Sequence, residues 1–226
     1  AKKIPQNPNL IKGKLSNGLT YYIYPNDYPK GEAIYRLFIK SGSVFETEDQ
    51  KGLAHFLEHM AFNGTTHFPG NSMIRFLESH GAKFGKDLNA HTSMNETVYK
   101  LQLPSSDRQM VDSTITILAD WVGHLLLDSM EIENERGVIL SEWLSRTGPE
   151  SEIGEAFLME ILNDSRYSER KTIGDTAIIR HFKHEEIKNY YKDWYAPRLM
   201  AVAVAGDVDS EYVKNLIVEK FGPLRN

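Results

Sequence analysis

The sequence of 226 residues contains no cysteine. Disulfides and thiolate metal sites are therefore excluded, and any bound metal has to be held by His, Asp or Glu side chains. Long apolar runs are missing as well, because the longest smooth one, Met200 to Ala205, has only the length of a strand. We therefore expect no membrane-spanning segment. The first ten residues lack the apolar core of a secretion signal, so we expect that such a signal is either absent or already removed.

An excess of basic residues is missing too. Lys and Arg number 26 against 31 Asp and Glu, which gives a formal net charge of −5. Proteins that bind nucleic acid usually carry a basic stripe, so we expect no nucleic-acid partner. The 41% of hydrophobic and 25% of charged residues are instead typical of a soluble globular protein. The length suffices for one large domain or two small ones with a sizeable core.

Strands are predicted in the first, middle and last parts of the chain. Residues 11–27 are predicted to form a hairpin with Asn17-Gly18 as its two-residue turn, and residues 33–43 a third strand rich in β-branched and aromatic side chains. Two more extended stretches are expected at residues 83–92 and 96–103, joined by a polar turn. A buried strand is expected at residues 198–208.

Helices are predicted for most of the remaining chain. The segments with helical spacing or helix stop signals are residues 49–63, 71–80, 105–127, 130–144, 151–162, 183–195 and 210–221. Internal repeats and linker-like runs of Gly, Pro and Ser are missing from the sequence. We therefore expect residues 1–226 to form a single α+β domain, an antiparallel sheet with helices packed mainly on one face.

The stretch GLAHFLEHMAFNGT, residues 52–65, places two histidines four residues apart with a glutamate directly before the second. Because a helix advances about 100° per residue, Glu58 and His59 lie within about 60° of His55 on one face. The opposite face is apolar and consists of Leu53, Phe56, Leu57 and Met60. One face of this helix is therefore expected to belong to the core, and the other to present two imidazoles and a carboxylate.

This polar face has two interpretations. Two imidazoles one helical turn apart suit the binding of one Zn²⁺, and the carboxylate between them is placed to take a proton from water beside the metal. The alternative is a solvated helix face whose polar side chains have no common function. The accompanying glutamate and the strongly apolar opposite face favour the metal site. The order H-x-x-E-H is the reverse of the more familiar zinc motif H-E-x-x-H and keeps the same three groups on one face.

With these residues the sequence resembles the pitrilysin/insulinase family of zinc peptidases with an inverted metal motif, which includes the mitochondrial processing peptidases. LNAHTSMNETVYKLQLP is similar to the strand pair after the family's metal helix, and ENERGVILSEW to its third-ligand helix. YKDWYAPRLMAVAVAGDVD is similar to the stretch that closes its amino-terminal domain. The resemblance spans nearly the whole chain and is greatest to long bacterial members. It implies the fold of a pitrilysin/insulinase half-unit and the role of an amino-terminal catalytic domain.

The third protein ligand that a catalytic zinc site usually needs is expected on the second of these stretches. Glu135 and Glu142 lie seven residues apart and hence on one helix face. The resemblance implies that the second of the pair is the ligand and the first a supporting residue, although the family's usual spacing from His59 points to Glu135. We expect Glu142 to bind the metal and Glu135 to orient a ligand. The alternative is that either glutamate lies on a solvated helix face.

The resemblance also implies where a substrate binds. Asn89 and Ala90 stand at the family's strand edge, which pairs with the backbone of a peptide by strand addition. The alternative is an ordinary edge strand. The histidines outside the motif lack an accompanying acid or stand alone, and we expect them to be structural or at the surface: His67, His80, His91, His124, His181 and His184.

The implied function is that of a zinc-dependent endopeptidase domain that hydrolyses peptides or small unfolded proteins. Zn²⁺ is expected on His55, His59 and Glu142, with Glu58 as the general base and Glu135 in support. Family members complete the site with an arginine and a tyrosine from a companion carboxy-terminal half. We therefore expect the chain to be part of a longer protein, or to need a homologous partner chain, and to be weakly active or inactive alone.

Two other functions remain open at this stage. Some relatives have lost the metal motif and serve as non-catalytic interaction or scaffold subunits of peptidase-like assemblies, and a zinc hydrolase of non-peptide substrates is the second alternative. The resemblance to long bacterial members implies the bacterial periplasm as the location, with the cytoplasm as the alternative.

Overall fold

The computed structural model describes residues 5, 7–104 and 106–226, and within them six strands form one sheet. The order in the sheet is β1-β2-β6-β3-β5-β4. The strands are β1 (Ile11–Lys14), β2 (Thr20–Pro25), β3 (Ala33–Ile39), β4 (Leu88–Thr92), β5 (Thr97–Leu103) and β6 (Met200–Gly206). Strand β4 lies at the edge of the sheet, and β6, the last strand along the chain, lies near its middle.

The sheet is mixed, which corrects the expectation of an antiparallel sheet. β6 pairs antiparallel with β3 but parallel with β2, while the other neighbours are antiparallel. A parallel neighbour needs a long crossover connection, and here the helices that precede β6 supply it. The first hairpin also differs, because Leu15 and Leu19 close a loop of three residues, with Gly18 at φ +94°, in place of the predicted two-residue turn.

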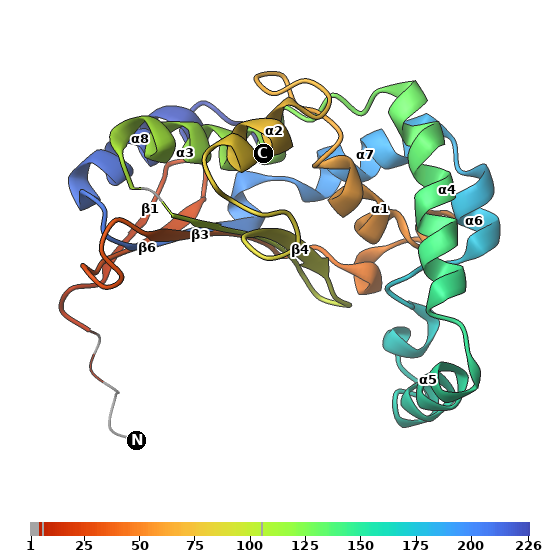
Figure 1. Ribbon diagram of the computed structural model, residues 1–226. Helices are drawn as coiled ribbons and strands as arrows, with labels where there is room; N and C mark the ends of the chain where they lie inside the picture. Colours follow the sequence, from red (N-terminus) through yellow and green to blue (C-terminus); the bar gives the residue numbers. More distant parts are fainter. Residues whose placement is uncertain (1–4, 6, 105) are drawn as a thin grey trace.

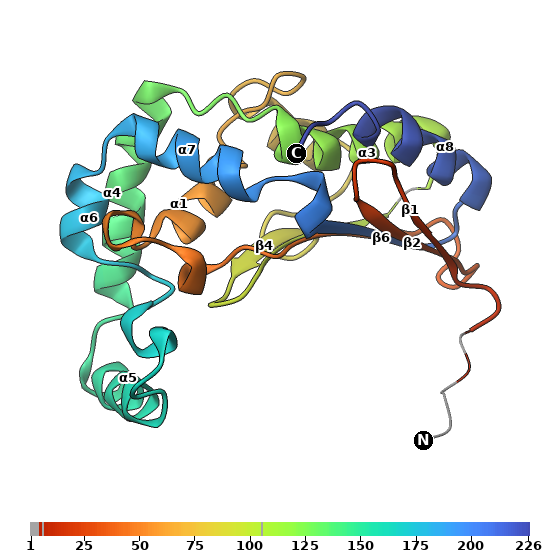
Figure 2. The same ribbon diagram turned by 180° about the vertical axis from the view of Figure 1, so that it is seen from behind.

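The helices that cover the sheet lie on one of its faces, as the sequence predicts. α2 (Ser72–Ser79), α3 (Arg108–Gly123) and α8 (Ser210–Phe221) lie over the same side (Figures 1 and 2). Burial alternates along the strands accordingly. In β3, for example, Tyr35 and Leu37 are fully buried beneath the helices while Ile34 on the other face is exposed.

A second group of helices gathers beyond one end of the sheet and contains the candidate site (Figures 1 and 2). It consists of α1 (Leu53–Met60), α4 (Ser129–Ser145), α6 (Thr176–His181) and α7 (His184–Trp194). α5 (Pro149–Ile161) projects from the end of α4. Short 3-10 turns are η1 (Ser43–Phe45), η2 (Glu48–Gln50), η3 (Arg166–Glu169) and η4 (Pro197–Leu199). Every predicted helix is present, α6 is additional, and the predicted first residue of α3, Ser105, lies outside the described residues.

No helix in the described part of the chain has both the length and the apolarity that a bilayer crossing needs.

Candidate metal centre

The helix that carries the two histidines follows its N-cap residue Gly52, and a carboxylate six residues before Gly52 caps it. The N-cap residue Gly52 provides no side chain, so Glu46 accepts hydrogen bonds from the backbone N–H groups of Gly52 and Ala54 at 2.9 and 2.8 Å. Glu46 is fully buried, and burial raises its pKa to about 8, although these hydrogen bonds and Arg170 oppose the rise. Gly52 has a φ of +104°, and it packs so closely on Gly174 that a Cβ on Gly174 would lie 2.4 Å from the Cα of Gly52.

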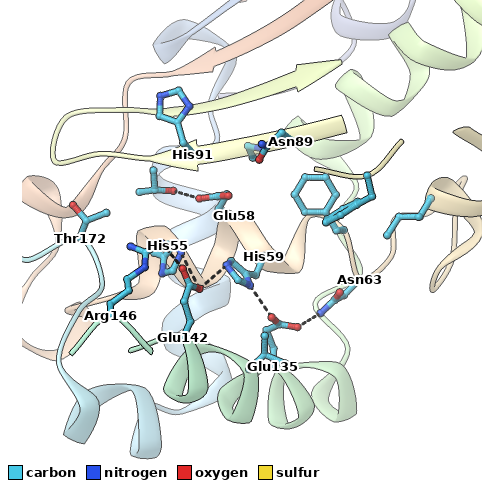
Figure 3. A pocket seen from close by; sticks show the side chains of 16 residues that line it. His55, Glu58, His59, Asn63, Asn89, His91, Glu135, Glu142, Arg146 and Thr172 are labelled. Atoms are coloured by element: carbon cyan, nitrogen blue, oxygen red, sulfur yellow. Dashed lines mark hydrogen bonds and ion pairs between the residues drawn. The ribbon is translucent and has the colours of Figure 1, made fainter. Parts of the chain in front are cut away.

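Both faces of α1 are covered by protein. The apolar residues predicted for the core are buried, but His55 and Glu58 are also only 6% and 7% exposed. α4 packs across the polar face, so the helix presents its imidazoles and carboxylate to another helix and to a cavity (Figure 3). A solvated helix face is therefore the wrong interpretation of this motif.

Three side chains from α1 and α4 converge on one point. Glu142 Oε2 lies 3.6 Å from His55 Nε2 and 3.4 Å from His59 Nε2, and the three donor atoms lie within 4.8 Å of one another. These separations are long for hydrogen bonds. They match the spacing of about 3.4 Å between two ligand atoms that share a tetrahedral zinc at about 2.1 Å. Two imidazoles and a carboxylate are also a donor set that zinc accepts, so the residues present fit this metal.

Glu135 lies behind His59 and outside this group of donors. Its Oε1 is 2.8 Å from His59 Nδ1, and its Oε2 accepts a hydrogen bond from Asn63 at 2.7 Å (Figure 3). A carboxylate at Nδ1 fixes the orientation of the imidazole and leaves Nε2 facing Glu142. Glu142 therefore lies with the histidine nitrogens, and Glu135 contacts the far side of the His59 ring. This arrangement agrees with the similarity to the family's third-ligand helix, which indicated Glu142 as the ligand. It does not agree with the family's usual spacing from His59, which indicated Glu135.

The surroundings of the two imidazoles shift their pKa values in opposite directions. Burial, with the charges of His59 and Arg146 nearby, lowers the pKa of His55 to about 3, so this ring is neutral, as a metal ligand has to be. Burial alone also lowers the pKa of His59, but the hydrogen bond to Glu135 and the surrounding carboxylates raise it overall. Burial tends to raise the pKa of Glu135, and its bonds to His59 and Asn63 outweigh this and lower it.

Glu58 faces the same cavity without joining the three donors. Its Oε2 accepts a hydrogen bond of 2.7 Å from the hydroxyl of Thr92, at the end of β4. Burial raises the pKa of Glu58, and the bond from Thr92 opposes the rise. A carboxylate with a raised pKa beside a metal site is suited to accept a proton from water.

The cavity has a volume of about 530 Å³ and runs along the edge of the sheet. Asn89 and Ala90 of β4 line it, as does His91, which we expected to be structural or at the surface. In β4 the backbone of Asn89 pairs with β5, whereas the N–H and C=O groups of Ala90 and Thr92 point to the open edge. The side-chain oxygen of Asn89 accepts a hydrogen bond from the Ala90 N–H at 2.8 Å.

The structure brings together every residue that the sequence proposed for the site: His55, Glu58, His59, Asn89, Ala90, Glu135 and Glu142. It adds Asn63 and Thr92, which hold Glu135 and Glu58, and Arg146, which donates to Glu142 Oε1. Arg146 stands one helical turn after Glu142, a spacing that the sequence shows but that does not by itself indicate a site. Of the other histidines, His67 is bound to the buried Asp120, and His184 to Glu133.

Comparison with known families and proteins gives two adjacent matches. A family model described as Insulinase (Peptidase family M16) matches residues 21–176, and one described as Peptidase M16 inactive domain matches residues 181–226. All three candidate metal ligands lie within the first match. The second match contains α7, β6 and α8.

Individual relatives agree with these models. The sequence is 39% identical to the probable zinc protease PqqL of Haemophilus influenzae and 37% identical to that of Escherichia coli, over 95% and 99% of this chain. These matches cover 23% and 24% of the relatives, so the chain spans about a quarter of their length. The crystal structure of the first half of the periplasmic protease PqqL from Escherichia coli superposes with a TM-score of 0.92 at 36% identity, covering 98% of this chain and 47% of that one.

Proposed function

The chain belongs to the insulinase family of peptidases, family M16, and from this premise we propose that it is the zinc-binding catalytic part of an endopeptidase. One observation carries the proposal. His55, His59 and Glu142 converge on one point, with the carboxylate of Glu58 beside them, in a cavity that opens along a strand edge. Neither a scaffold protein nor a structural metal site needs a buried base beside the ligands.

The proposed roles follow from the contacts. His55 and His59 bind Zn²⁺ through Nε2 and Glu142 through its carboxylate, while Glu135 orients His59. The chemistry that zinc supplies when bound is polarisation of the scissile carbonyl and of the attacking water. Glu58 accepts the proton of that water and passes it to the leaving amine, and Thr92 holds Glu58 in position for both transfers.

The substrate is proposed to be a peptide in extended conformation that pairs with β4. The outward-facing backbone groups of Ala90 and Thr92 offer the hydrogen bonds, and Asn89 lies beside them. Because the Ala90 N–H already donates to the side chain of Asn89, an incoming strand has to displace that side chain or pair with the other outward-facing backbone groups of β4. Main-chain pairing selects extended peptides and small unfolded proteins over folded ones.

We also propose that residues 1–226 form one domain that works with a companion carboxy-terminal half. The relatives are about four times as long as this chain, and the solved first half of PqqL is about twice as long. Within the chain, β6 from the region of the second family match pairs with β2 and β3 from the first, which supports one folded unit. The periplasm is the proposed location, in line with the solved relative described as periplasmic.

The test is hydrolysis of unstructured peptides by the zinc-loaded protein assembled with its companion half, compared with its Glu58→Gln variant. Glutamine keeps the side-chain volume, so zinc content and fold are expected to be unchanged while kcat falls by about 10²–10⁴-fold. Equal turnover by the zinc-loaded variant would rule out Glu58 as the base. Zinc binding with ester hydrolysis but without peptide hydrolysis would favour a hydrolase of another substrate class, and binding of peptides without any hydrolysis would favour the scaffold function.

A further inference from the structure

Helix α5 borders a second cavity, next to the metal centre. All thirteen residues of α5 are described, and they are exposed or half-buried; the half-buried ones, Glu155 and Met159, lie one turn apart. With Leu158 they form one face, which borders a cavity of about 520 Å³ between α5, the end of α4 and residues 171–173. Met94, from the turn between β4 and β5, also lines it.

The lining of this second cavity is suited to an apolar group. Five of the side chains that line it are large and apolar: Met94, Trp143, Leu158, Met159 and Ile173. Two of its charges, Lys171 and Glu155, form a salt bridge of 2.9 Å and so compensate each other. An apolar group placed here would cover side chains that are now half-buried or exposed, which stabilises binding in proportion to the area removed from water.

The second cavity adjoins the cavity of the metal centre. Arg146 and Thr172 line both of them. Arg146 donates a hydrogen bond to one oxygen of Glu142, whose other oxygen faces the two histidines. Figure 3 shows Arg146 and Thr172 on the side of Glu142 and His55 that is remote from Glu135.

The open edge of β4 directs an extended peptide toward this second cavity. Thr92, which contacts Glu58, is the last residue of β4, and Met94 follows it in the turn. A peptide paired with the edge and continuing past Thr92 therefore reaches the second cavity. Residues of a strand advance about 3.3 Å each, so the occupant lies only a few residues from the bond that faces Glu58.

We propose that this second cavity is a specificity subsite that binds an apolar side chain of the peptide, such as leucine or methionine, a few residues from the scissile bond. The inference rests on the proposed function and identifies the class of sequence that the site selects. The two residues shared with the cavity of the metal centre, Arg146 and Thr172, favour a substrate side chain as the occupant. The path from the open edge of β4 past Thr92 to Met94 also favours a peptide over a surface of the companion half or of a second copy of the chain.

The experiment measures peptide binding, so that it does not depend on turnover. Fluorescein-labelled peptides of alanine and serine, each with one leucine at a successive position, are titrated into the zinc-loaded Glu58→Gln protein with its companion half, and anisotropy is recorded. One position is expected at which leucine binds about tenfold or more tightly than alanine, the discrimination usual for an apolar pocket. Leu158→Glu is expected to bring that ratio close to one.

Two further variants make the result specific to the second cavity. Gly154→Leu places a side chain where a Cβ meets no atom within 4 Å, and it favours the helix, so it is expected to fill the cavity and remove the preference without unfolding. Phe157→Glu is the matched control, because Phe157 is the neighbour of Leu158 on α5, is 68% exposed and does not line the cavity. Its leucine preference is expected to equal that of the Glu58→Gln parent protein.

An unchanged preference in Leu158→Glu and Gly154→Leu, or an equal loss in Phe157→Glu, would overturn the subsite. The same holds if no position prefers leucine in the parent protein. Loss of the companion half from Leu158→Glu on size-exclusion chromatography, with the preference intact, would assign this face to assembly instead. Failure of the protein with Glu58 to hydrolyse any peptide would refute the proposed function alone, because the binding preference is measured without it.

Discussion

Replacing each of the two glutamates of α4 by glutamine separates a metal ligand from a residue that orients one. Glu142 offers an oxygen to the point where both histidine Nε2 atoms converge, whereas Glu135 touches the opposite side of the His59 ring at 2.8 Å. We therefore expect Glu142→Gln to lose zinc under mild chelation and Glu135→Gln to retain it with reduced affinity.

The size of the Glu135 effect follows from its two hydrogen bonds, to His59 and Asn63. A glutamine oxygen keeps one of these bonds in neutral form, and its amide group faces the other donor. Bonds to a charged group contribute about 1.5–3 kcal/mol and neutral ones about 1 kcal/mol, so the bond to His59 loses about 0.5–2 kcal/mol when it becomes neutral, or roughly 2–30-fold in zinc affinity. Loss of Glu142 removes a donor atom and a negative charge, so it is expected to exceed the 100-fold upper range for residues that only orient ligands.

The assay is competition with a chromophoric zinc chelator at fixed pH and ionic strength, because His59 has to lose a proton to bind metal. Glu133→Gln is the control. Its side chain lies on the same helix, is 55% exposed and pairs with Arg136 and His184 away from the centre. A larger loss for Glu135→Gln than for Glu142→Gln would show that Glu135 is the ligand. Losses equal to the control in both variants would remove α4 from the metal site.

Two further predictions concern carboxylates whose pKa the fold raises. The hydroxyl of Thr92 stabilises the ionised form of Glu58, and Thr92→Val removes it. In this variant the acid limb of the kcat/KM profile of the zinc-loaded assembly is expected to move to higher pH by about one unit. An unmoved limb would contradict the role of Thr92. The folded pKa of about 8 for Glu46 lies above its unfolded value, so its contribution to stability is complete below about pH 4.5 and declines as the pH rises. Urea unfolding gives the free energy of unfolding of the metal-free wild type and of Glu46→Gln. The difference between the two is expected to shrink by on the order of 3 kcal/mol from pH 5 to pH 8, and a constant difference would refute this.

The parts of the site that were predictable from sequence are those whose signal is local. The spacing of His55, Glu58 and His59 determines a shared helix face, and seven residues place Glu135 and Glu142 on another. Burial of α1 on both sides was not predictable in this way. Periodicity shows that a face is polar, but it does not show whether another helix covers it, and here α4 does.

Features that depend on distant contacts were missed. The parallel pairing of β6 with β2 joins strands from opposite ends of the chain, and local pattern carries no information about register or partner. α6 has six residues, too few for a periodic signal, and its cap Asp175 resembles any loop aspartate. Asn63 and Thr92 act through bonds to residues 72 and 34 positions away, so their roles become visible only in the folded chain.

The place of β6 in the sheet determines the order in which the protein can assemble. In the described sheet β1 and β2 form one part and β3, β5 and β4 another, and during synthesis the two parts cannot be joined until residues 200–206 leave the ribosome. Until then β2 and β3 both expose an edge that can pair wrongly with other chains. The candidate metal ligands lie between residues 55 and 142, yet the sheet beside them is completed by β6, which follows all of them in the chain. A nascent chain that already has its candidate zinc ligands but still lacks β6 therefore exposes the edges of both β2 and β3.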